Sequence, residues 1–183
     1  MTSRWRLFYL VYLSRPATDR ALYRAIVRRE LGSILEIGVG TGRRAVRMIQ
    51  AAQSRFPESQ VCYAGVDEFE ARAADQAAGL PLKAAYQMLR RTGARIRLLP
   101  GDPATAIPRA ANTLAKVDLL VISAGITPES LAPAWLYVPR VLSEQSLVVH
   151  ERSDSVGSPV GFRVVSRRRI EELAIRATGR RAA

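Results

Sequence analysis

Residues 34–42 read ILEIGVGTG, and this stretch decides the fold. A short apolar run that contains one acid, Glu36, leads directly into three glycines at alternate positions, Gly38, Gly40 and Gly42. Glycine inside a regular element costs about 0.5–1 kcal/mol relative to alanine, so the cluster indicates that bare backbone is required here. Residues 43–56 follow with apolar side chains near helical spacing. The pattern predicts a strand, a glycine-rich turn and a helix.

Short apolar runs alternate with amphipathic stretches along the rest of the chain. Further strands are expected at 60–67, 95–102, 116–125 and 145–151, and further helices at 70–77, 81–93 and 133–143, the last with Pro139 as a kink or boundary. This alternation is typical of a parallel sheet that helices cover on both faces. The sequence therefore predicts an α/β fold, a Rossmann-like, doubly wound and mostly parallel sheet, in a single domain over residues 1–183.

Beyond Glu151 the sequence offers one clear strand, 161–165, and one helix, 168–177. The C-terminal part of the domain is therefore expected to be shortened, which leaves one edge of the sheet short. An exposed sheet edge is a liability. The N-terminal run 6–13 or a second subunit, in a homodimer, could cover it.

Composition bounds the class of protein. The chain has 183 residues, of which 48% are hydrophobic, and this suits one globular domain. The longest N-terminal apolar run, 7–13, is far shorter than the roughly 20 residues of a membrane span, so we interpret it as a buried element. A single cysteine, Cys62, excludes an internal disulfide and metal-cluster spacing. We expect a cytoplasmic protein with no metal and no membrane partner.

The net charge of +12 invites a nucleic-acid interpretation. However, every basic residue except Lys83 and Lys116 is an arginine, and no basic run exceeds three residues. Such a skew is typical of arginine codon usage in a GC-rich genome, and the sequence shows no basic stripe interleaved with aromatic residues. A solvated basic surface is favoured over a dedicated nucleic-acid site.

The glycine turn stands where open parallel sheets bind their ligands, at the carboxyl end of a strand. Counted from Gly38, the dinucleotide pattern G-x-G-x-x-G fails at Arg43, which disfavours an NAD-linked oxidoreductase. The spacing E-x-G-x-G-x-G from Glu36 instead resembles the first motif of the class I S-adenosylmethionine-dependent methyltransferases. The resemblance extends over roughly residues 30–150, with further motifs in the family's order.

The resemblance implies S-adenosyl-L-methionine as the cofactor and assigns its contacts. Asp67, at the end of the second strand, would accept hydrogen bonds from the ribose hydroxyls, and Asp102 would lie near the adenine amino group. Ser123 ends the segment that is similar to the family's fourth strand. The cofactor-binding set is thus Glu36, Gly38, Gly40, Gly42, Asp67, Glu68, Asp102 and Ser123.

Each acid also has a structural interpretation. Glu36 could be a helix-capping or a salt-bridged acid, and Asp67 could cap the helix that follows it. Asp102 precedes Pro103 in a common turn signature, and Asp118 is expected to be structural. His150, the single histidine, could be a base near the acceptor but is more often a structural residue at such a place.

Methyl transfer from a sulfonium is an in-line displacement, and its main demand is to hold donor and acceptor about 3 Å apart. The resemblance implies a methyltransferase whose acceptor, a small molecule or another compound, the sequence does not identify. No catalytic residue is assigned, and no N/D-P-P-Y segment is present. A nucleic-acid (RNA) methyltransferase and a cofactor-binding, non-catalytic module remain as alternatives.

Overall fold

The computed structural model describes residues 4–72, 79–154 and 159–182. Six strands form one sheet in the order β3-β2-β1-β4-β5-β6. They are β1 (Ser33–Ile37), β2 (Cys62–Asp67), β3 (Arg95–Pro100), β4 (Val117–Ile122), β5 (Leu142–Ser153) and β6 (Pro159–Val164). All neighbouring strands are parallel except β5 and β6, which are antiparallel. The strand order reverses between β1 and β4, so this is the switch point at which such sheets bind ligands.

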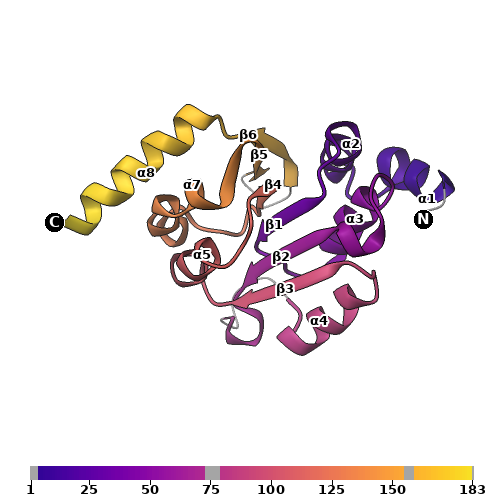
Figure 1. Ribbon diagram of the computed structural model, residues 1–183, viewed down its shortest axis with the longest axis horizontal. Helices are drawn as coiled ribbons and strands as arrows, with labels where there is room; N and C mark the ends of the chain where they lie inside the picture. The colour runs from indigo at the N-terminus through magenta and orange to yellow at the C-terminus, as the bar shows by residue number, and fades with distance from the viewer. Residues whose placement is uncertain (1–3, 73–78, 155–158, 183) are drawn as a thin grey trace.

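Helices cover both faces of the sheet (Figure 1). On one face lie α2 (Asp19–Arg29), α3 (Arg43–Ala52) and α4 (Leu82–Arg90), and on the other lie α5 (Pro103–Ala111), α6 (Pro128–Leu131), α7 (Val138–Val141) and α8 (Arg167–Ala182). Short 3-10 turns occupy Glu58–Gln60, Phe69–Ala71 and Pro133–Leu136. At the N-terminus α1 (Arg4–Phe8) continues into a π-helical stretch, Tyr9–Leu13.

Successive strand residues serve two separate cores because side chains alternate between the faces of a strand. In β1, Ile34 packs in the core with α2 and α3, whereas Leu35 and Ile37 pack in the core with α5 and α7. Glu36 therefore points to the same face of the sheet as Ile34, the face that α3 covers, and the Glu36 side chain is completely buried there. At the opposite end of the sheet from the glycine turn, Asp118 accepts hydrogen bonds from the backbone N–H groups of Gly32 and Ser33, as a structural acid would.

The α/β fold, with its doubly wound and mostly parallel sheet, is confirmed. The five expected parallel strands are present, and the shortened C-terminal part consists of β6 and α8. The stretch 133–143 is not one helix, since it divides into Pro133–Leu136 and α7 before β5 begins at Leu142. The helix expected at 70–77 falls largely outside the described residues.

The expectation for the N-terminal run 7–13 was wrong. The run does not fill the sheet edge, because it is helical and β6 pairs with β5 at that edge. Nor is it wholly buried, since only Leu10 and Val11 are buried within it. A helix that packs one side on the protein leaves its other side in water, whatever residues stand there. Within the described residues, no helix combines the length and the apolar character that crossing a membrane requires.

Candidate functional site

The glycine turn after β1 has a backbone that other residues rarely adopt. Gly38, Gly40 and Gly42 have φ angles of +91°, +57° and +70°, in the left-handed region that favours glycine. A Cβ on Gly38 would lie 2.8 Å from the side chain of Ser123, whereas a Cβ on Gly40 would meet no atom within 4 Å. The turn thus needs glycine for its conformation, and at Gly40 it also presents bare backbone to open space.

That space belongs to a pocket of about 790 Å³ at the carboxyl ends of the strands. Its lining comes from the glycine turn, from the segments that follow β2, β3 and β4, from α3, and from Glu151 of β5. The residues between α1 and α2 close one end. The lining includes Arg15, Pro16, Asp19, Gly38, Gly40, Thr41, Arg43, Arg44, Arg47, Asp67, Glu68, Arg72, Ser123, Ile126, Ser130 and Glu151.

Asp67 ties the end of β2 to the glycine turn. Its Oδ2 accepts a hydrogen bond from the backbone N–H of Gly40 at 2.8 Å, and its Oδ1 accepts one from the N–H of Phe69 at 3.0 Å. Oδ1 also pairs with the guanidinium of Arg72. Asp67 is buried, and these three donors satisfy its buried carboxyl oxygens. Glu68, beside it, is half-buried and also lines the pocket.

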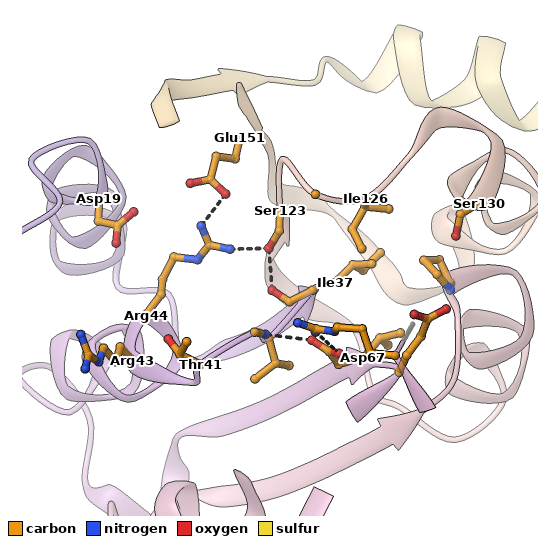
Figure 2. A pocket seen from close by; sticks show the side chains of 18 of the residues that line it. Asp19, Ile37, Thr41, Arg43, Arg44, Asp67, Ser123, Ile126, Ser130 and Glu151 are labelled. Atoms are coloured by element: carbon orange, nitrogen blue, oxygen red, sulfur yellow. Dashed lines mark hydrogen bonds and ion pairs between the residues drawn. The ribbon is translucent and has the colours of Figure 1, made fainter. Parts of the chain in front are cut away.

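Arg44 joins three strand ends through one guanidinium. Its Nε donates to Glu36 Oε1 at 2.8 Å and its Nη1 to Glu151 Oε2 at 2.7 Å, while Nη2 donates to Ser123 Oγ. Ser123 Oγ in turn donates to the carbonyl oxygen of Gly38 at 2.6 Å. Figure 2 shows Arg44 reaching from α3 across the pocket toward Ser123 and Glu151. The network fixes the ends of β1, β4 and β5 relative to one another.

Glu36 is the buried member of this network. Burial raises the pKa of its carboxyl group, and the charge of Arg44 and the hydroxyl of Tyr63, which donates to Oε2, act in the opposite direction. Burial likewise raises the pKa of the Tyr63 hydroxyl, with the charge of Glu36 adding to it. Glu36 is thus salt-bridged to Arg44, which lines the pocket, whereas Glu36 itself is not among the lining residues.

Asp19, the first residue of α2, also lines the pocket. It is buried, and its Oδ2 accepts a hydrogen bond from the hydroxyl of Tyr23 at 3.2 Å, whereas its Oδ1 has no hydrogen-bond partner among the described residues. Burial raises the pKa of this carboxyl group, and the charge of Arg44 opposes the rise. Figure 2 shows Asp19 on α2, on the same side of the pocket as Glu151 and Arg43. Asp19 is therefore a carboxyl group with acceptor capacity to spare.

The expected cofactor-binding residues divide by position. Gly38, Gly40, Asp67, Glu68 and Ser123 line the pocket, whereas Glu36, Gly42 and Asp102 are not among its lining residues. Gly42 is the N-cap residue immediately before α3, and Asp102 caps α5 by accepting a hydrogen bond from the N–H of Thr105 at 3.0 Å. His150 lies within β5, away from the lining, and burial lowers the pKa of its imidazole. No group of acids, histidines and cysteine in the described part of the chain could hold a metal ion.

Arg44, Glu151 and Asp19 were missed from the sequence. Arg44 lies in the run Arg43-Arg44, which resembles other solvated basic runs, and Glu151 is 107 residues away from it along the chain. One signal could have found Arg44. A carboxylate inside an apolar strand needs a cation, and Arg44 stands on the first turn of the helix that leaves the same strand.

The comparisons with known proteins agree with this geometry. No protein-family model and no curated protein matches the chain. Among solved structures, it is similar to a proposed caffeoyl-CoA O-methyltransferase from Staphylococcus aureus, with 15% identity, 90% of this chain and 73% of that chain covered, and a TM-score of 0.56.

Two further solved structures have a TM-score of 0.53. A TehB-like SAM-dependent methyltransferase from Corynebacterium glutamicum is 18% identical, over 95% of this chain and 78% of that chain. The O-methyltransferase TomG from Streptomyces achromogenes, solved in complex with SAM, is 16% identical over 77% of this chain and 57% of that chain. At such identities a likeness establishes the fold, and the chain has the fold of the class I S-adenosylmethionine-dependent methyltransferases.

Proposed function

We propose that the chain binds S-adenosylmethionine in the pocket at the glycine turn and transfers its methyl group to an acceptor that is still to be identified. One observation carries the proposal. The left-handed turn leaves open space over Gly40, directly beside Asp67, at the switch point of the sheet between β1 and β4. The bound cofactor would supply an activated methyl group, and the task of the protein is to position it.

The residues of the pocket fit this cofactor in size and in chemistry. A volume of about 790 Å³ lies in the range of small-molecule sites. A carboxylate offers about four acceptor positions, and Asp67 uses three of them for Gly40, Phe69 and Arg72. Two ribose hydroxyls would need two positions, so ribose binding by Asp67 requires Arg72 to give up its bond to this carboxylate.

Asp19 is the residue that we propose as proton acceptor where the methyl acceptor must lose a proton. Its Oδ1 has no partner among the described residues, and burial raises the pKa of the carboxyl group, which brings it closer to the pH range in which a general base works well. Glu151 is less suited, because it already accepts from Arg44 and from the N–H of Ala124.

The direct test is transfer of a labelled methyl group. The full chain would be incubated with methyl-labelled S-adenosylmethionine and fractionated small molecules, and label recovered in one fraction would identify the acceptor. At an S-adenosylmethionine concentration well below saturation, Gly40→Ala should reduce transfer at least about tenfold, because Gly40 lines the pocket and the new Cβ would stand in open space there. Gly179→Ala should retain it, since Gly179 also has open space but stands in α8. Transfer by Gly40→Ala at the wild-type rate under these conditions would refute the site.

The arginines of the pocket support a second candidate, a nucleic-acid acceptor. Arg15, Arg43, Arg44, Arg47 and Arg72 all line the pocket, a gathering that codon usage alone does not explain. Of these, Arg44 and Arg72 form ion pairs with acids of the site. Binding of a single-stranded RNA that persists at moderate salt, and that weakens in Arg43→Gln, would favour this acceptor over a small molecule.

A further inference from the structure

The outer side of the N-terminal helical segment is an exposed aromatic surface. Trp5 is 82% exposed, Phe8 48%, Tyr9 46%, Tyr12 55% and Leu13 55%. We refer to these five residues as the aromatic face. The other large exposed hydrophobic residues of the described chain lie on α4, β6 and α8; they are Tyr86, Val160, Val164 and Ile175. Single exposed apolar residues are ordinary, but a group of this size on one element marks an interaction site.

The N-terminal helical segment cannot rotate to bury the aromatic face, because its opposite side is already packed against the protein. Leu10 and Val11 are buried, and Leu10 belongs to the same core as Leu22 and Ile26 of α2. The hydroxyl of Ser14 donates to the carbonyl oxygen of Leu10 at 2.7 Å and closes the end of the segment. Figure 1 shows α1 at the edge of the molecule beside α2, away from α8. The aromatic face is thus held outward on a fixed support.

A groove of about 320 Å³ continues the face toward α2. Leu7, Phe8, Val11, Tyr12 and Val27 give it an apolar lining, and three arginines stand at it, Arg4, Arg24 and Arg28. The rings of Phe8 and Tyr12 lie 5.1 Å apart. The surface therefore combines an apolar centre with positive charge around it.

The charged residues that line the groove or stand on α1 are all arginines. Arg4, Arg6, Arg24 and Arg28 are exposed, and none takes part in an ion pair found in the described residues. The first acid of the chain is Asp19, which is buried at the pocket instead of facing this surface. An occupant of the face should therefore be apolar at its centre and anionic at its edge.

We propose that the aromatic face docks the protein on an anionic lipid surface. Tryptophan and tyrosine side chains favour the interface between headgroups and acyl chains, and arginines beside them are attracted to anionic headgroups. The expectation of no membrane partner rested on the lack of a span, which docking at a surface does not need. This proposal goes beyond the proposed methyl transfer and does not depend on it.

The same observations disfavour the two other occupants. In a symmetric dimer through this face, the surface would meet its own copy, so arginines would approach arginines at a like-charge cost. Single-stranded nucleic acid is bound in grooves that follow its backbone with positive charge, whereas the lining of this groove is mostly aliphatic and aromatic.

The test uses the full chain and two kinds of vesicle, phosphatidylcholine alone and phosphatidylcholine with about a third phosphatidylserine. Trp5 is itself a reporter, because the only other tryptophan, Trp135, is 6% exposed. We expect at least about tenfold more co-sedimentation with the anionic vesicles and a shift of tryptophan emission to shorter wavelength. No preference for the anionic vesicles, or no shift, would overturn the proposal.

Two sets of variants separate the apolar and the charged parts. A combined Trp5→Ser, Phe8→Ser and Leu13→Ser variant should lose about tenfold or more of the binding, and each of Arg4→Gln and Arg6→Gln about fivefold. A Val164→Ser and Ile175→Ser variant, which removes equally exposed apolar residues elsewhere, should bind as wild type. The proposal fails if the serine variant binds vesicles normally, or if the face instead supports a dimer or RNA binding that this variant abolishes.

Discussion

Replacing Arg44 by glutamine tests the network that holds the strand ends together. Arg44 is the only residue among those described that forms an ion pair with Glu36, and the side chain of Glu36 is 0% exposed. The side chain of Arg44 is 15% exposed, so solvent screens the pair little. In Arg44→Gln, Glu36 would keep the hydroxyl of Tyr63 but would lose its cation.

Removal of one partner from a buried ion pair costs about 3–5 kcal/mol, because the other charge is left uncompensated. For a chain of this size, such a loss lowers the midpoint of thermal unfolding by about 6–20 °C. Glu151 would lose the same partner but keep its bond from the N–H of Ala124. The buried Glu36 therefore accounts for most of the expected loss.

The loss should depend on pH with a definite sign. Without Arg44, burial raises the pKa of Glu36 with less opposition, further above its ordinary value of 4.5. A carboxyl group with a raised pKa in the folded state contributes stability below its unfolded pKa and loses it as pH rises through the folded pKa. Arg44→Gln should therefore be least stable at alkaline pH and should recover toward wild type as the pH falls to about 5.

Thermal and urea unfolding across this pH range would measure the effect. Arg43→Gln is the matched control, since Arg43 is exposed on the same helical turn, and it should unfold like wild type. If Arg44→Gln does not fold, the double variant Arg44→Gln, Glu36→Gln should restore folding, because it also removes the buried, uncompensated charge of Glu36. Equal stability of Arg44→Gln and Arg43→Gln at pH 8, or no rescue by the double variant, would refute the reasoning.

Three further predictions concern the pocket. Gly40→Ala should lower the free energy of unfolding by about 1–2 kcal/mol, because φ is +57° there, and should weaken S-adenosylmethionine binding at least about tenfold in calorimetry; unchanged affinity would contradict the site. Asp67→Asn puts an NH₂ group where an oxygen accepts from Gly40 or Phe69, so urea unfolding should show a loss of about 1.5–3 kcal/mol; an unchanged urea midpoint would mean that these bonds contribute nothing. Asp19→Asn removes a carboxyl group whose pKa is raised by burial above 3.8. We expect the free energy of unfolding of wild type to fall as pH rises from about 4 to 8, and this fall should be smaller in the variant. Parallel pH profiles of unfolding for the two proteins would argue against the raised pKa.

Much of the sheet could be predicted because its strands carry local signals. The runs that became β1, β2 and β4 are apolar and end at glycine, aspartate or serine, which marks both the strand and its carboxyl end. The N-terminal run shows the limit. Its apolar residues predicted burial, yet only one side of a helix can pack on α2, so Tyr9 and Tyr12 remain exposed. Which residues of an all-apolar helix are buried depends on tertiary packing, which periodicity does not contain.

The candidate site divides in the same way. Gly38 and Gly40 could be singled out because their spacing reflects a local backbone requirement. The roles of Glu36 and Asp102 could not, since an acid before a glycine turn or a proline fits a ligand contact, a salt bridge or a cap equally well. The Arg44 network depends on β1, β4 and β5 ending side by side, a property of the topology that no local stretch encodes.

The central claim is that the pocket at the glycine turn binds S-adenosylmethionine. Calorimetric titration of the full chain with S-adenosylhomocysteine and with NAD, each against wild type and Gly40→Ala, tests it most directly. The account predicts one site for S-adenosylhomocysteine in wild type, at least about tenfold weaker binding in Gly40→Ala, and no binding of NAD at the same concentrations. Binding of NAD in preference to S-adenosylhomocysteine, or equal affinity of S-adenosylhomocysteine for both proteins, would contradict it.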